Sequence, residues 1–286
     1  MKVRRVAVIG AGTMGNGIAH VCALGGLGVS LVDADAAALD RGLATIGRNL
    51  GRQLARGKIT AEERAGALAR IEGGRSLDAA AHADLVIEAV PEHASLKREI
   101  FAELDGVTPP GTILASNTSS ISITAIAAAT GRPGQVIGMH FMNPVPVMKL
   151  VEVIRGLRTS DATTAAVMEL ARALGKTPVE ARDFPGFVSN RILMPMINEA
   201  VFALMEGVAD AEGIDTVMKL GMNHPMGPLA LADLIGLDTC LNILEVLHRE
   251  LGDDRYRPCP LLRQYVAAGW LGRKSGRGFH RYAPPG

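Results

Sequence analysis

The most constraining feature of the chain is a glycine-rich turn with the sequence G-A-G-T-M-G at residues 10–15, directly after an apolar run at residues 6–9. This spacing between a strand and a helix is typical of a dinucleotide-binding unit. Gly10 permits the tight turn, Gly12 lets the backbone approach a pyrophosphate, and Gly15 lets the helix pack close to the strand. The helix N-terminus then offers unpaired N–H groups to phosphates. We predict cofactor binding by Gly10, Gly12, Thr13, Met14 and Gly15.

An acidic residue ends the second predicted strand. The mostly apolar residues 29–32 (V-S-L-V) lead into Asp33, which lies near the spacing of about 20 residues at which a carboxylate binds the ribose hydroxyls in this fold. A 2′-phosphate at that place would meet a like charge, so Asp33 predicts NAD rather than NADP. The alternative is an ordinary strand–turn–helix with no cofactor. That alternative leaves the acid after the second strand unexplained.

Strand and helix patterns alternate along the first 180 or so residues. Further strands are expected at residues 83–90, 112–116, 135–140, 149–154 and 177–180, and helices at 35–56, 93–104, 121–129 and 161–174. This alternation predicts an α/β fold with a Rossmann-type, doubly wound, mostly parallel sheet.

The pattern becomes helical after residue 183. Helices are expected at residues 187–206, 210–220, 227–250 and 260–268, the third broken at Gly236. Asp183 is a candidate cap for the first of them. We therefore predict an NAD-binding domain over residues 1–183 and an all-α substrate and dimerisation domain over residues 184–286.

Composition excludes several classes of protein. The net charge of +1 gives no general attraction for nucleic acid. The chain has three cysteines, far apart and without metal-ligand spacing, which indicates a reducing compartment and no metal site. No apolar run reaches the length that spans a membrane, and no signal-peptide cleavage pattern follows the basic start. We expect a cytoplasmic protein that binds neither nucleic acid nor a membrane.

Three polar residues stand where strands end or begin. Ser119 and His140 follow predicted strands, and Glu152 lies in the strand after His140. Ligands of doubly wound sheets bind beyond the carboxyl ends of the strands. A histidine there can act as a general base, and a glutamate at its other ring nitrogen would fix the tautomer. The alternatives remain a helix cap for Ser119, a loop position for His140 and an edge carboxylate for Glu152.

Several strings together resemble the L-3-hydroxyacyl-CoA dehydrogenase family, and among its members the small bacterial 3-hydroxybutyryl-CoA dehydrogenases. They are IEAVPE (87–92), ASNTSS (115–120), GMHFMNPVP (138–146), KLVEV (149–153), PGFVSNR (185–191), HPMGPL (224–229) and GRKSGRGF (272–279). The match is ordered and covers nearly the whole chain. It implies NAD-dependent oxidation of short-chain L-3-hydroxyacyl-CoA, with 3-hydroxybutyryl-CoA and acetoacetyl-CoA as the expected pair.

The resemblance also implies roles for individual residues. His140 matches the base that takes the proton of the 3-hydroxyl, and Glu152 matches its paired carboxylate. Ser119 and Asn190 match residues that hold the substrate oxygen. Residues on the cofactor side of the site are Glu92, Lys97, Asn117, Ser119 and Asn143. Two departures from the family pattern affect pocket shape: Met142 where phenylalanine is frequent, and His280 where tyrosine is common.

A basic helix face offers a site for the phosphates of CoA. Arg48, Arg52 and Arg56 recur every four residues and so share one face, with Lys58 just beyond. The resemblance places CoA contacts in this region, for which Arg52 and Arg56 are the candidates. The alternative is an ordinary solvated face.

Two rival functions remain open. A dehydrogenase for a free hydroxy acid would not need a distant phosphate site. A non-catalytic dinucleotide-binding protein would not need Ser119, His140, Glu152 and Asn190 together. The resemblance, with the apolar character of residues 187–206, also predicts a homodimer.

Overall fold

A computed structural model describes residues 3–283 of the chain. The chain divides into two compact units, one that extends through Phe184 and one that begins at Pro185. The first unit is built on a sheet and the second is helical, so the predicted fold class is confirmed. None of the helices within residues 3–283 is long and apolar enough to cross a membrane.

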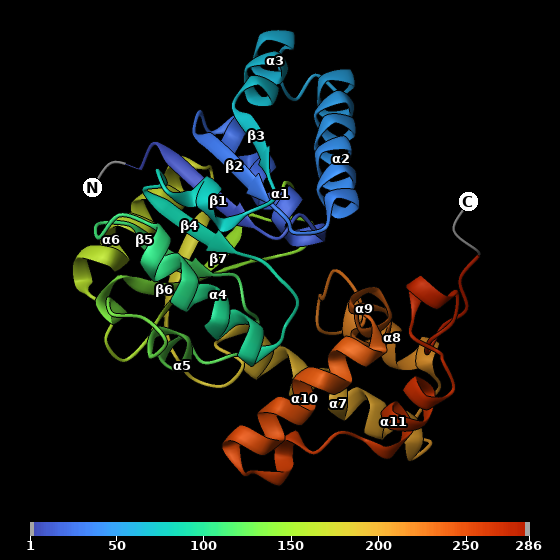
Figure 1. Ribbon diagram of the computed structural model, residues 1–286. Helices are drawn as coiled ribbons and strands as arrows, with labels where there is room; N and C mark the ends of the chain where they lie inside the picture. Colours follow the sequence, from blue (N-terminus) through green and yellow to red (C-terminus); the bar gives the residue numbers. More distant parts are fainter. Residues whose placement is uncertain (1–2, 284–286) are drawn as a thin grey trace. The chain divides into compact units, whose positions relative to one another are not determined.

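The first unit contains one eight-stranded sheet in the order β3-β2-β1-β4-β5-β6-β7-β8 (Figure 1). All neighbouring strands run parallel except β6 and β7, which are antiparallel. The strands are β1 (Arg5–Ile9), β2 (Gly28–Val32), β3 (Ile71–Gly74), β4 (Leu85–Glu88), β5 (Ile113–Ser116), β6 (Val136–Phe141), β7 (Leu150–Arg155) and β8 (Thr177–Arg182).

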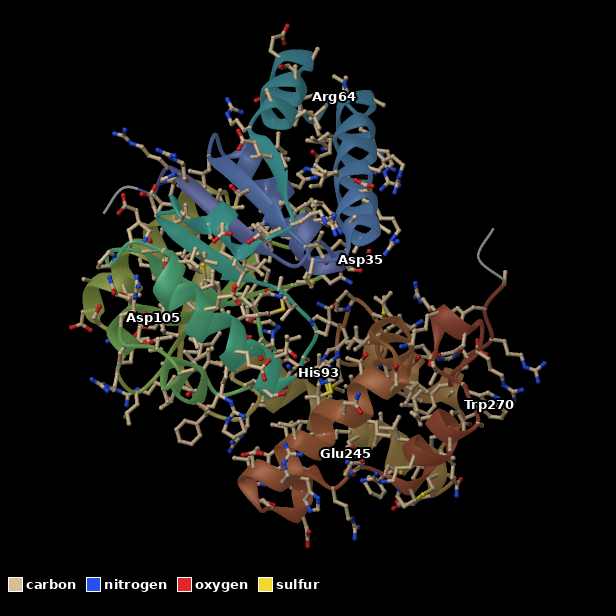
Figure 2. The ribbon with its side chains drawn as sticks, viewed as in Figure 1. Asp35, Arg64, His93, Asp105, Glu245 and Trp270 are labelled. Carbon is tan, nitrogen blue, oxygen red and sulfur yellow. The ribbon has the colours of Figure 1, made fainter. Side chains whose placement is uncertain are left out.

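Helices pack on this sheet because their apolar stripes must be buried. They are α1 (Thr13–Leu24), α2 (Ala36–Ala55), α3 (Ala61–Ala69), α4 (Ala94–Val107), α5 (Ile123–Ala127) and α6 (Asp161–Ala173), with short 3₁₀ turns at Leu77–Ala80 and Pro133–Gln135. Figure 1 shows α2 and α3 standing out from the sheet beside one another. Asp35, labelled at the foot of α2 in Figure 2, caps that helix by accepting the Ala37 N–H at 2.9 Å.

The turn between β1 and α1 has the geometry expected of its glycines. Gly10 has a φ of +99°, and a Cβ there would lie 2.7 Å from the Ala89 carbonyl oxygen. A Cβ on Gly15 would lie 1.7 Å from the carbonyl oxygen of Gly10. Both positions therefore require glycine, the first for the turn and the second for the close approach of α1.

Two elements were not expected from the sequence. These elements, α3 and β3, follow α2. The strand pattern of β3 is weak in the sequence because two of the four residues of Ile71–Gly74 are glycines.

The predicted helix cap at Asp183 is wrong. Asp183 accepts hydrogen bonds from the Ile123 and Thr124 N–H groups at 3.0 and 2.7 Å, so it caps α5, about sixty residues earlier in the chain.

The second unit consists of α7 (Ser189–Met205), α8 (Ala211–Leu220), α9 (Pro228–Ile235), α10 (Leu237–Leu251) and α11 (Pro260–Ala267), with 3₁₀ turns at Asp254–Tyr256 and Arg273–Ser275. Its core includes Met194, Ile197, Leu244 and Leu247, all buried. The predicted break at Gly236 is confirmed, since its φ of +105° separates α9 from α10.

Candidate active site

His140 and Glu152 face one another across the antiparallel strands β6 and β7. The Nδ1 atom of His140 lies 2.8 Å from Oε2 of Glu152. Their side chains are 11% and 2% exposed. An ionised carboxylate only accepts hydrogen bonds, so this contact favours the tautomer with the proton on Nδ1 and the basic lone pair on Nε2. The predicted pairing of the two residues is therefore present in the structure.

Apolar neighbours set the register of this pair. Met139 and Phe141 flank the histidine, Val151 and Val153 flank the glutamate, and all four are buried. These four residues belong to one apolar core cluster, so slipping either strand by one residue would place the polar His140 or Glu152 in that core. The cost of burying a polar side chain there specifies the register. The packing of the hydrophobic residues in the two strands thus places the imidazole opposite the carboxylate.

The loop that carries Ser119 is held by the carboxylate of Glu92. Its Oε1 atom accepts the backbone N–H groups of Ser119 and Ser120 at 2.9 and 3.1 Å and the Thr118 hydroxyl at 2.5 Å. The Glu92 side chain is 36% exposed, and its partial burial by itself would raise the pKa of the carboxyl. The Lys97 ammonium and the hydrogen bonds of the loop outweigh burial and hold this pKa below its usual value.

Lys97 and Glu88 form a buried ion pair beneath that loop. The Nζ atom of Lys97 lies 2.7 Å from Glu88 Oε1, 3.2 Å from the Val90 carbonyl oxygen and 3.3 Å from Glu92 Oε2. The other Glu88 oxygen accepts the Ser116 hydroxyl at 2.6 Å. The ammonium has three hydrogens and three acceptors within the protein. These contacts place Lys97 behind Glu92, and its predicted contact with a cofactor stays a prediction.

Two asparagines lie near the end of β6. Asn117 accepts the backbone N–H of Phe141 through its Oδ1 atom at 2.9 Å. Asn143 is exposed in the loop that joins β6 to β7. Lys176 holds this loop, because its buried ammonium donates to the carbonyls of Val145 and Met148. Sequence reasoning missed Glu88 and Lys176, whose partners lie in other elements.

The glycine-rich turn provides a place for a dinucleotide. A Cβ on Gly12 would meet no protein atom within 4 Å, so internal packing does not require glycine there, and the backbone stays open to a pyrophosphate. Asp33 accepts the Ala11 N–H at 2.8 Å through one oxygen and the Asp35 N–H at 3.0 Å through the other. Each carboxylate oxygen accepts two hydrogen bonds, so capacity for ribose hydroxyls remains. These residues fit an NAD cofactor.

The basic face on α2 is present in the structure. Arg48, Arg52 and Arg56 are all exposed. Within residues 3–283, no carboxylate lies within ion-pair distance of any of them. Two of these arginines donate hydrogen bonds to uncharged side chains of α2. Arg48 donates to the Thr45 hydroxyl at 2.8 Å, and Arg52 donates to the Asn49 side-chain oxygen.

The remaining predicted residue, Asn190, belongs to the second unit. Asn190 is buried in the first turn of α7. In the same unit His280, one of the two departures from the family pattern, lies 2.7 Å from the buried Asp215 carboxylate. Met142, the other departure, is half-buried directly after β6.

Comparison with known families decides the relationship of this chain. A sequence model for the NAD binding domain of 3-hydroxyacyl-CoA dehydrogenase matches residues 5–184. The model for the C-terminal domain of the same enzyme matches residues 186–282. The chain belongs to the 3-hydroxyacyl-CoA dehydrogenase family. Its first unit is thus the family's NAD-binding domain and its second unit the family's C-terminal domain.

Members of this family resemble the chain along nearly its whole length. It is 60% identical over 282 residues to a probable 3-hydroxybutyryl-CoA dehydrogenase of Bacillus subtilis, covering 99% of this chain and 98% of that protein. It is 58% identical to the 3-hydroxybutyryl-CoA dehydrogenase of Bradyrhizobium diazoefficiens, covering 98% and 96%. The solved (S)-3-hydroxybutyryl-CoA dehydrogenase of Ralstonia eutropha superposes with a TM-score of 0.96 at 55% identity, covering 99% and 100%.

Proposed function

We propose that this family member catalyses the reversible NAD-dependent oxidation of (S)-3-hydroxybutyryl-CoA, the L isomer, to acetoacetyl-CoA. Relatives at 55–60% identity over nearly their whole length are named 3-hydroxybutyryl-CoA dehydrogenase or probable 3-hydroxybutyryl-CoA dehydrogenase. The observation that carries the proposal is the His140–Glu152 pair at 2.8 Å, built on a dinucleotide-binding sheet. A protein that only bound a dinucleotide would not need this pair.

Oxidation of the alcohol removes one proton and one hydride from the substrate. A bound nicotinamide supplies the hydride acceptor. His140 takes the proton of the 3-hydroxyl at Nε2 and returns it in the reverse direction. Glu152 holds the proton on Nδ1 and stabilises the imidazolium that forms. The hydroxyl of Ser119 and the amide of Asn190 hold the substrate oxygen, and Asn143 lies on the cofactor side.

CoA contributes binding energy at a distance from the reacting carbon. Its phosphates are anionic, and the exposed guanidinium groups of Arg52 and Arg56 supply the complementary charge. A dehydrogenase for a free hydroxy acid has no use for such a site. This feature favours the thioester over the free acid.

A direct comparison of substrates tests the proposal. The protein should oxidise NADH far faster with acetoacetyl-CoA than with free acetoacetate at equal concentration, as measured by the loss of NADH absorbance. The variant His140→Ala serves as the control for contaminating activity. Preference for free acetoacetate would favour the rival hydroxy-acid dehydrogenase, and no turnover with either compound would favour a binding protein.

A further inference from the structure

The backbone pairing between β5 and β6 stops short of the site. The parallel register reaches Ser116 opposite Gly138, whereas β6 continues to Phe141. Phe141 is 1% exposed, so its backbone N–H needs an acceptor inside the protein. The Oδ1 atom of Asn117 is that acceptor, at 2.9 Å. A side chain thus extends the contact between the two strands beyond the end of the ladder.

Asn117 is itself firmly placed. Its backbone N–H donates to the Glu88 carbonyl at 2.8 Å, which ties it to the end of β4. Ser119 lies two residues further along the chain, and His140 directly precedes Phe141. One amide side chain therefore connects the strand end that presents the imidazole to the loop that presents the hydroxyl.

The end of β6 is held from both sides by this arrangement. On one side β7 places Glu152 opposite His140. On the other side Asn117 holds the next peptide group, while Glu92 holds the loop that follows Asn117. The spacing between the imidazole and the Ser119 hydroxyl depends on the Asn117 bond, because the β5–β6 ladder has already ended.

We infer that Asn117 is a positioning residue that sets the spacing between Ser119 and His140. This inference rests on the proposed function, in which both residues act at the substrate oxygen. A displacement of a reacting group by 1 Å can cost about 10²-fold in rate. An asparagine that only satisfied the Phe141 N–H would affect stability and leave turnover of the folded protein unchanged.

Two variants of nearly the same shape separate these roles. Asn117→Leu removes the acceptor, and we expect kcat with acetoacetyl-CoA at saturating NADH to fall roughly 10- to 100-fold. Asn117→Asp keeps an oxygen acceptor and should recover most of the rate.

A control variant removes a comparable bond at the opposite end of β5. The Thr112 hydroxyl donates to the Ala83 carbonyl at 2.7 Å in a buried site. Thr112→Val should lower the thermal midpoint and leave kcat near that of the unmodified protein. Loss of rate in this control as large as in Asn117→Leu would show that any weakening of β5 suffices, and would overturn the inference.

Rescue by the conservative variant separates positioning from stability. Far-UV circular dichroism confirms that both Asn117 variants are folded before their kcat values are compared. Wild-type kcat in folded Asn117→Leu, or a folded Asn117→Asp as slow as Asn117→Leu, overturns the positioning role. Failure of the unmodified protein to use acetoacetyl-CoA would instead refute the proposed function.

Discussion

Across the strands β6 and β7, the imidazole of His140 lies 2.8 Å from the carboxylate of Glu152, a residue 12 positions further along the chain. Replacing His140 with alanine removes the proposed base. The kcat with acetoacetyl-CoA should fall by roughly 10²- to 10⁴-fold, the usual range for a general acid–base group. The Kd for NADH, measured by fluorescence titration, should change little. Turnover near that of the unmodified protein would refute the assignment.

Glu152→Gln keeps the shape of the glutamate but removes its charge. The variant should bind NADH normally and turn over slowly, because the imidazolium loses its counter-charge and the amide no longer fixes one tautomer. Glu180→Gln is a suitable control, because it removes an exposed carboxylate from the neighbouring strand β8. Equal kcat in the two variants would contradict a role for Glu152.

The carboxylate of Glu92 makes stability depend on pH. Its pKa lies below the usual value, so its contribution is complete above the ordinary glutamate pKa of about 4.3 and is lost as the pH falls through the lowered value. Glu92→Gln should lower the free energy of unfolding by roughly 1–2 kcal/mol at pH 7 and by less under acidic conditions. Urea titration followed by far-UV circular dichroism measures both values.

The control for Glu92 is an exposed carboxylate on α4, Glu103. Glu103→Gln causes the same change in charge without loss of a network of hydrogen bonds. We expect it to change stability little at either pH. A difference between Glu92→Gln and the unmodified protein that stayed constant from neutral to acidic pH would contradict the linkage.

The basic face of α2 predicts a selective effect on KM. Arg52→Ala combined with Arg56→Ala should raise KM for acetoacetyl-CoA more than it changes kcat, because contacts with the distant phosphates are equal in the ground and transition states. The KM of the unmodified protein should also rise with salt. Arg158→Ala with Arg172→Ala, also exposed, removes the same charge elsewhere on this unit. An equal KM in the two double variants would support the alternative that these arginines form an ordinary solvated surface and do not bind CoA.

Local patterns predicted much of this molecule. The glycine turn and the break at Gly236 depend on backbone conformations that few residue types permit, so the sequence indicates them directly. The acid after β2 is indicated by its spacing from the glycine turn. The strand pattern placed His140 and Glu152 on neighbouring segments, and the family resemblance implied their pairing. The orientation of these strands, and the capping of α5 by Asp183, depend on segments brought together only by folding. The ion pair between Glu88 and Lys97 also forms only on folding, and in the sequence Glu88 resembles any acidic residue at the end of a strand.

The exposed apolar surface of the helical unit indicates a homodimer. Large apolar side chains remain exposed on or beside α7, α8 and α9, among them Ile192, Val217, Leu220, Met222 and Leu234. Burial against a second copy would remove this surface from water. Light scattering at micromolar concentration should therefore give about twice the chain mass of 30.0 kDa.

Aspartate substitutions in this surface test whether it forms the contact. Ile192→Asp with Leu220→Asp should shift the measured mass toward that of a single chain. Leu157→Asp is the matched control, since Leu157 is 87% exposed in the other unit. A mass near 30.0 kDa for the unmodified protein would refute the dimer.

Asp33 predicts the choice of cofactor. Its carboxylate lies at the end of β2 beside the glycine turn and retains capacity for the ribose hydroxyls. The 2′-phosphate of NADPH would meet a like charge there, and the neighbouring Ala34 offers no cation in compensation. The guanidinium of Arg41 lies 3.7 Å from the carboxylate of Asp35, so its charge is paired with that group. We expect kcat/KM for NADH to exceed that for NADPH at least about tenfold, or about 1.4 kcal/mol.

Exchange of the charge at this position should reverse the preference. Asp33→Ala with Ala34→Arg removes the repulsion and supplies a guanidinium for the 2′-phosphate, so the ratio of the two kcat/KM values should narrow or invert. Ala34→Arg alone is the control, because it leaves the carboxylate and its hydrogen bonds to the Ala11 and Asp35 backbone in place. We expect that single variant to keep its preference for NADH. Equal use of both cofactors by the unmodified protein would show that Asp33 does not bind the ribose.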